Sequence, residues 1–153
     1  MTEQLVESWQ IHNRITLFLL DAVKAAQLEI APASKGRNVG QLFAHIHNVR
    51  IMWLKSAAPD LLDRVEKLDP ESLTHPALVK ALADSGAAIE MLLQRSLSNG
   101  GRVKGFKPHA TAFLCYLITH EAHHRGQAAL ILRLAGQPLD KKIAYGIWEW
   151  GTR

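Results

Sequence analysis

Apolar residues recur at intervals of three and four along most of this sequence, and that spacing constrains the fold more than any other feature. It is the period of a helix with one buried face, and it fills residues 2–30, 39–57, 76–98 and 108–135. No segment shows the apolar–polar alternation of a half-buried strand, and no internal repeat is present. Four long helices joined by short to moderate links predict an all-α four-helix bundle.

The breaks between these segments carry residues that start or stop helices. Asn38 is a good N-cap for the second helix, and Gly136 ends the fourth. The link after the second helix holds at most a short helical turn near residues 60–67. Beyond Gly136 we expect a non-helical tail packed on the bundle, because Trp148 and Trp150 are costly to leave in water.

Length and composition indicate an ordinary globular protein. The 153 residues suit one domain, residues 1–153, with a single sizeable core. The net charge of +4 comes from Lys and Arg spread along the chain, which favours solubility over nucleic-acid binding. The start, MTEQLVESWQ, lacks the features of a signal peptide, and no apolar run approaches the roughly 20 residues of a membrane span. Cys115 is the only cysteine, which excludes an internal disulfide. Together, these features predict a cytoplasmic protein without membrane or nucleic-acid partners.

Residues 119–127, THEAHHRGQ, concentrate histidines on the fourth helix. His120 and His124 are one turn apart on the stripe that faces the core, a spacing that lets two imidazoles reach one metal ion. His123 lies about 60° from His120 round the helix, and could line a pocket or an interface. Glu121 lies about 100° from His120 and should point further away. The helix therefore offers two candidate metal ligands.

A third ligand must come from another helix, and His45 fits best because it shares the apolar face of the second helix. His47 is about 200° from His45 round that helix and cannot face the same ion. His75 and His109 stand at helix starts, where side chains are usually hydrated. His12, on the inner face of the first helix, is the alternative ligand or a pocket residue.

Core histidines satisfied by hydrogen bonds are the alternative to a metal site. Three unpaired imidazoles in one apolar core are costly to desolvate, however, and a divalent metal satisfies them directly. Three neutral imidazoles with an open position are typical of catalytic zinc, while nickel or ferrous iron also accept nitrogen ligands. The reacting group would be a water or thiol activated at the metal, and no protein side chain is assigned that role.

The same segment matches the H-E-x-x-H motif of zinc peptidases, in which the glutamate is a general base and the third ligand lies downstream. Here the downstream candidates are only Asp140, in a polar turn, and Glu149, between two tryptophans. The best third ligand is upstream, and no sheet is available to bind an extended peptide. A peptidase is therefore disfavoured.

Three stretches, LFAHIHNVRIMWL, THEAHHRGQAALILRLAG and YGIWEWG, resemble the DinB-like (YfiT-like) superfamily, whose members are regarded as metal-dependent enzymes. The likeness covers nearly the whole chain and implies an antiparallel four-helix bundle with a long crossover, often dimeric. It also implies that His45, His120 and His124 hold the metal, the same three that the spacing selects. Arg50 stands where some relatives carry an acidic residue, so no role of that acid transfers to this chain.

Superfamily members of known activity resemble thiol S-transferases or isomerases that use low-molecular-weight thiols. For this chain, the metal site and the resemblance imply a thiol-S-transferase-like or hydrolase-like enzyme acting on a small molecule, as a homodimer. A non-catalytic metal-binding or ligand-sensing bundle is the alternative, and an open coordination position would distinguish the two. Arg50 and Arg125 could bind a carboxylate of a thiol, although solvated arginines are the favoured interpretation. Trp148 and Trp150 are expected to pack the mouth of the bundle, a role compatible with substrate recognition, so Trp148 is a pocket candidate.

Overall fold

The computed structural model describes residues 2–153, and four long helices account for most of them. These are α1 (Thr2–Ala22), α2 (Val39–Ala57), α3 (His75–Ser98) and α4 (Ala110–Leu134). Shorter helices are the 3₁₀ segments Ala25–Glu29, Pro59–Arg64 and Trp150–Thr152, and α5 (Lys141–Gly146). Residues 2–153 contain no strand, only an isolated bridge between Arg102 and His109. The predicted all-α bundle is confirmed.

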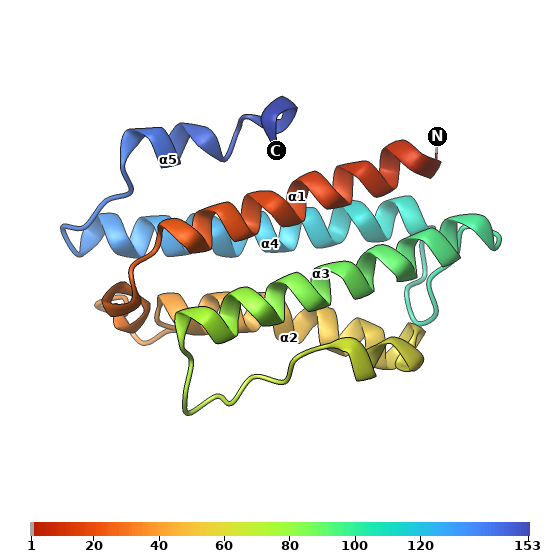
Figure 1. The fold of residues 1–153 in the computed structure, drawn as a ribbon, viewed down its shortest axis with the longest axis horizontal. Coiled ribbons are helices and arrows are strands. Elements are labelled where there is room, and N and C mark those ends of the chain that lie inside the picture. Colours follow the sequence, from red (N-terminus) through yellow and green to blue (C-terminus); the bar gives the residue numbers. More distant parts are fainter. Residues whose placement is uncertain (1) are drawn as a thin grey trace.

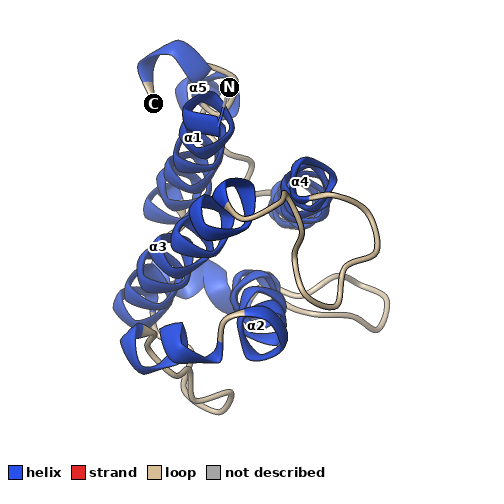
Figure 2. Cartoon of the chain, turned by 90° about the vertical axis from the view of Figure 1, so that its right-hand side faces the viewer, coloured by secondary structure: helices blue, strands red, loops and turns tan. Residues whose placement is uncertain are grey.

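The four long helices surround one core in the order α1, α3, α2, α4, as the end-on view shows (Figure 2). The helices α1 and α4 run in one direction and α2 and α3 in the other (Figure 1). Since α2 and α3 are parallel, residues 58–74 must return along the bundle between them, which is the long crossover that the resemblance implied. Among the described residues, no helix combines the length and apolar content needed to cross a membrane.

The start of α2 is set by a local cap, and the end of α1 by packing against α2. Asn38 caps α2: its Oδ1 accepts the Gln41 N–H at 2.8 Å, and the Gln41 side chain accepts the Asn38 N–H at 3.0 Å. The first helix is shorter than predicted, because residues 25–29 form a separate 3₁₀ helix that buries Leu28 and packs against α2. Gly40 permits this approach, since a Cβ there would lie 3.3 Å from the Leu28 carbonyl oxygen.

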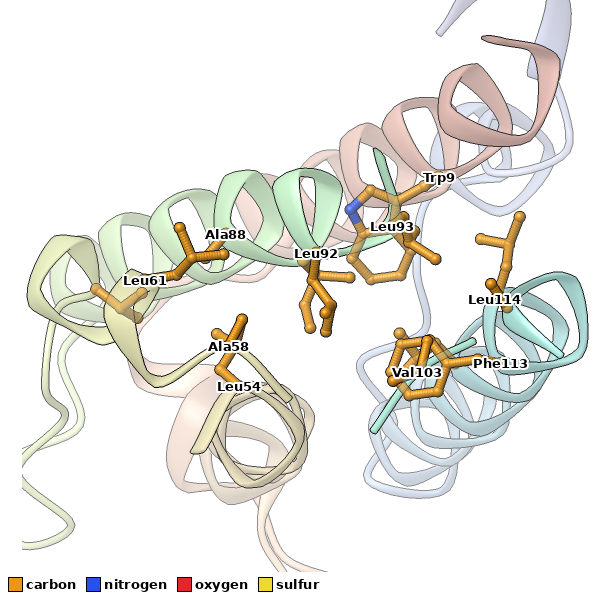
Figure 3. Close-up of a cluster of buried hydrophobic side chains, with 14 residues drawn as sticks. Trp9, Leu54, Ala58, Leu61, Ala88, Leu92, Leu93, Val103, Phe113 and Leu114 are labelled. Atoms are coloured by element: carbon orange, nitrogen blue, oxygen red, sulfur yellow. The ribbon is translucent and has the colours of Figure 1, made fainter. Parts of the chain in front are cut away.

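Two apolar layers fill the bundle, one toward each end. The first is built around Trp9, Leu54 and Phe113 (Figure 3), and the second around Leu20 and Ile46. Polar side chains occupy the level between these layers. The buried ones are His12, Thr16, His47, Arg50, Ser85, Glu121, His124 and Arg125. The candidate functional groups therefore lie midway along the bundle.

The C-terminal tail differs from its prediction in two respects. Lys141–Gly146 form the helix α5, where a non-helical chain was expected. The tail returns along α1 (Figure 1), but Trp148 is 75% and Trp150 37% exposed, so neither indole is buried in the bundle. Ile143 and Ile147, one helical turn apart, pack against the second apolar layer instead. With these inward positions taken, Trp148 is left on the outer side.

Candidate metal centre

The structure brings His45 of α2 together with His120 and His124 of α4, the three residues called here the histidine cluster. One ring nitrogen of each lies within 4.8 Å of the other two. The Nε2 atoms of His120 and His124 are 3.1 Å apart. Two nitrogens at ordinary zinc–nitrogen distances from one tetrahedral ion would be about 3.3 Å apart. The donor types and their spacing therefore fit a divalent metal ion.

Hydrogen bonds within α4 leave the nitrogens of the cluster available. The Nδ1 of His124 lies 2.7 Å from Oε1 of Gln127, an acceptor, so Nδ1–H donates and Nε2 carries the lone pair. The Nδ1 of His120 is buried and has no hydrogen-bond partner among the described residues. The Nε2 of His120 faces Nε2 of His124, so an ion at the cluster would be bound through Nε2 and not through this unpaired Nδ1.

The histidine cluster is neutral at neutral pH. Burial, followed by the charge of Arg37 and the neighbouring imidazoles, lowers the pKa of His45 to about 4. Burial is also the largest cause that lowers the pKa of His120 and of His124. Neutral imidazole is the form that binds metal ions, so no proton has to leave before an ion can bind.

The cluster does not include His47, His75, His109 or His123. His47 is buried on the opposite side of α2, where Nδ1 donates to a backbone carbonyl of α3 at 3.0 Å. His75 is half-buried and bonded to a carbonyl of α1 at 2.9 Å, so it is less hydrated than a helix start suggested. His109 is exposed and caps α4. His123 is exposed beside the cluster, as a residue at an interface or a pocket rim would be.

A second polar assembly lies on the other buried side of α4. Arg50 of α2 donates to both oxygens of Glu121, from Nε to Oε1 at 2.7 Å and from Nη2 to Oε2 at 2.7 Å. His12 of α1 approaches Oε2 of Glu121 with its Nε2 at 2.8 Å. Burial lowers the pKa of His12, so the ring is neutral and its Nε2–H donates. We call Arg50, Glu121, His12 and Arg125 the charge network.

This arrangement argues against a peptidase. Burial alone would raise the pKa of Glu121, but the charge and hydrogen bonds of Arg50, with the hydrogen bond of His12, lower it to about 2. A zinc-peptidase glutamate must take a proton from water beside the metal. Glu121 is fully buried, fixed in the core through both oxygens, and no member of the histidine cluster. The H-E-x-x-H match therefore carries a structural glutamate.

The surface beside His45 is hollowed into a cavity of about 730 Å³. Gln41, His45 and Asn48 line it from one face of α2, at successive turns of the helix. The crossover contributes an apolar wall, formed by Leu68, Pro70 and Leu73. Arg37 is the one charged side chain among the residues that line the cavity. A small molecule in this cavity would lie against one ligand of the candidate metal site.

Comparison with protein families agrees with this geometry. The model of the DinB family matches residues 1–146. The chain belongs to the DinB family. The match spans all four long helices and α5, which confirms the resemblance to the family; it includes the first two of the three short stretches and ends within the third, YGIWEWG. A search of curated proteins gave no match. Family membership and the histidine cluster together indicate a metal-binding DinB-like protein.

Sequence reasoning misplaced two arginines of this DinB bundle. Arg50 is fully buried and Arg125 is 9% exposed, where solvated side chains were favoured. The Nη1 of Arg125 donates to Oγ1 of Thr16 at 2.9 Å. Burial lowers the pKa of Arg125 to about 10, so the group remains a cation. Both guanidinium groups bond within the core, and neither lines the cavity; Arg37, which the sequence did not single out, does so instead.

Proposed function

We propose that this DinB-family protein is a metal-dependent enzyme that acts on a small molecule. One observation carries the proposal: three neutral imidazoles meet beside a cavity, and no fourth His, Cys, Asp or Glu of residues 2–153 joins them. Structural zinc sites are closed by four protein ligands, whereas catalytic sites keep a position open. Zinc is the proposed ion, and nickel and iron share its preference for imidazole.

Under this proposal, the side chains around the cavity have different roles. His45, His120 and His124 would hold the ion, which when bound supplies Lewis acidity toward an oxygen or sulfur nucleophile. Gln127 orients His124 through Nδ1. The crossover wall would exclude water from the apolar part of a substrate, and Arg37 would attract a negatively charged group at the rim.

Two reaction classes suit this site, and the cosubstrate separates them. With a low-molecular-weight thiol, a sulfur–carbon bond would form at an electrophilic carbon as the leaving group departs with its electron pair. With water, the same site would cleave an ester- or amide-like bond. The proposal is a thiol-S-transferase-like or hydrolase-like enzyme, and neither class requires a charged protein base at the ion.

Metal analysis followed by an activity screen tests this function. The purified protein should hold about one divalent ion per chain. His45→Ala, His120→Ala and His124→Ala should each lose the ion, whereas His123→Ala, a change at an exposed neighbour, should retain it. The metal-loaded protein is then screened with thiol and electrophile pairs and with activated esters. Metal retained in the His45→Ala variant, or a fourth protein ligand on the bound ion, would contradict the proposal.

We also propose a homodimer that covers apolar surface on the tail and the end of α4. Leu134, Tyr145 and Trp148 are 76%, 71% and 75% exposed, and large apolar side chains left in water are candidates for a protein interface. Light scattering should give twice the chain mass of 17.0 kDa, and Leu134→Ser with Trp148→Ser should halve that value. A parent protein that is monomeric at micromolar concentration would contradict this. A cytoplasmic location is proposed on the single cysteine, Cys115.

A further inference from the structure

Burying the charge network costs folding free energy, and its position in the bundle suggests why the network is present. Two guanidinium groups, Arg50 and Arg125, share the core with one carboxylate, Glu121, so the network carries a net positive charge. Buried ion pairs seldom stabilise a fold more than apolar residues of similar volume would. The network nevertheless occupies the level of the bundle at which the histidine cluster lies. A contribution of the charge network to the geometry of the histidine cluster would account for the network's position in the bundle.

The ion pair joins the same two helices that carry the three histidines. Arg50 follows His45 on α2 by five residues, and Glu121 directly follows His120 on α4. Both bonds between the guanidinium and carboxylate groups measure 2.7 Å. A bidentate pair of this kind is planar and directional, so it fixes the rotation of two elements as well as their separation.

The guanidinium group of Arg50 cannot shift to follow a displaced Glu121, because its remaining donor, Nη1, is bonded to α1 and α3. Its Nη1 donates to the Leu82 carbonyl of α3 at 2.9 Å and to Oδ1 of Asn13 of α1 at 2.9 Å. The guanidinium also lies 5.0 Å from the ring centroid of Trp9. Gly86 gives Asn13 its place, since a Cβ there would lie 2.3 Å from Nδ2 of Asn13. The arginine is therefore fixed relative to three helices before it meets Glu121.

We propose that the Arg50–Glu121 pair, supported by His12, is a positioning clamp that presets the spacing of the histidine nitrogens. Side chains reach roughly 5–6 Å from a helix axis, so rotating α4 by about 10° would move an imidazole nitrogen by about 1 Å. That displacement is about half a zinc–nitrogen bond. The inference rests on the proposed metal site and adds residues that would act on it without touching the ion.

Three variants test the clamp. Arg50→Lys keeps the charge and loses the two-pronged geometry. Arg50→Met with Glu121→Leu removes both charges and leaves neither member of the pair unpaired. Leu93→Ala is the control, because it opens the apolar layer near one end of the bundle and lowers stability without touching the network. For each, we would measure zinc affinity by competition with a chelator, the visible spectrum of the cobalt(II) form, and the melting temperature without metal.

The clamp predicts a specific division of effects. Both Arg50 variants should remain helical yet bind zinc about 10–100-fold more weakly, with changed cobalt bands, as happens when groups behind metal ligands are altered. Leu93→Ala should melt lower and bind zinc like the parent. Parent-like affinity and spectrum in Arg50→Lys, or an equal affinity loss in Leu93→Ala, would overturn the clamp and leave the metal site standing. Failure of both Arg50 variants to fold would assign the network to folding alone and also overturn it. A parent protein that binds no metal would remove the proposed function and the clamp together.

Discussion

Two polar assemblies share α4 at the same level, and they differ in how completely the protein satisfies them. In the charge network, Glu121 uses both oxygens, and Arg50 bonds to three other helices. In the histidine cluster, His120 keeps a buried nitrogen without a partner, and the cluster borders a cavity. The network faces the middle of the bundle, whereas the cluster lies where α2 and α4 meet.

This contrast distinguishes polar groups that stabilise the fold from polar groups that remain able to bind a ligand. A polar group that folding has satisfied has little to gain from a ligand, because its desolvation has already been offset by protein partners. A partly satisfied group keeps that interaction energy for another molecule. Changes in the network should therefore lower the free energy of unfolding of the metal-free chain in addition to any effect on metal affinity, while changes in the cluster should appear mainly in metal binding.

The largest expected effect is on stability. Glu121→Leu leaves Arg50 buried without its counter-charge, and breaking a buried pair in this way costs about 3–5 kcal/mol. Denaturant unfolding of the metal-free protein measures this cost. His120→Ala removes a half-buried ring with few bonds and should cost about 1 kcal/mol. Equal losses in the two variants would erase the distinction between network and cluster.

A second prediction compares two histidines of α2 through pH. Burial, followed by the charge of Arg50, lowers the pKa of His47 from 6.5 to about 4. The unfolded chain then takes up this proton first on acidification, so stability is full above pH 6.5 and falls between there and pH 4. The loss from His47 should reach about 3 kcal/mol. His45 is more exposed and should contribute less.

His47→Asn provides the control, because an amide can replace Nδ1–H as donor to the α3 carbonyl without titrating. Metal-free urea unfolding at several pH values should give a flatter profile for this variant than for the parent. An unchanged acid dependence would mean that other groups titrate in this range.

The smallest effect concerns Gln127. Gln127→Leu removes the acceptor that fixes the His124 ring, and metal affinity should fall about 10–100-fold with little change in melting temperature. Gln127→Glu keeps an acceptor at the same place and should bind at least as tightly as the parent. Competitive chelator titration distinguishes the two. Gln127→Leu with unimpaired affinity would show that the ring needs no such support.

The sequence predicted the helices and the histidine cluster because both depend on regular spacing. Apolar periodicity gave four segments, and Asn38 and Gly136 marked two of their ends correctly. His120 and His124 are one turn apart, and His45 lies on the inward face of its helix, so straight-helix geometry was enough to bring them together. The early end of α1 depends on how Leu28 packs under α2, which local spacing does not encode.

The charge network escaped prediction because charged residues on a helix are usually solvated. A signal was nevertheless present. Glu121 and Arg125 are one turn apart and interrupt the stripe from Leu114 to Leu132, which is otherwise apolar and buried at its ends. Opposite charges inside an apolar stripe indicate burial only if partners exist elsewhere, and Arg50 is distant in sequence. The exposure of Trp148 was not predicted either, because it depends on which tail residues pack against the bundle.

The long crossover separates the part of the cavity that can vary from the part that cannot. Three cavity-lining residues, Leu68, Pro70 and Leu73, lie in the connection between the 3₁₀ helix Pro59–Arg64 and α3, and the candidate ligands lie on α2 and α4. Substitutions in a surface connection are tolerated far better than substitutions in packed helices. The shape and polarity of this wall could thus change, or be redesigned, while the geometry of the histidine cluster stays the same. Under the proposed function, one bundle could in this way supply a series of catalysts that differ in the molecules they accept.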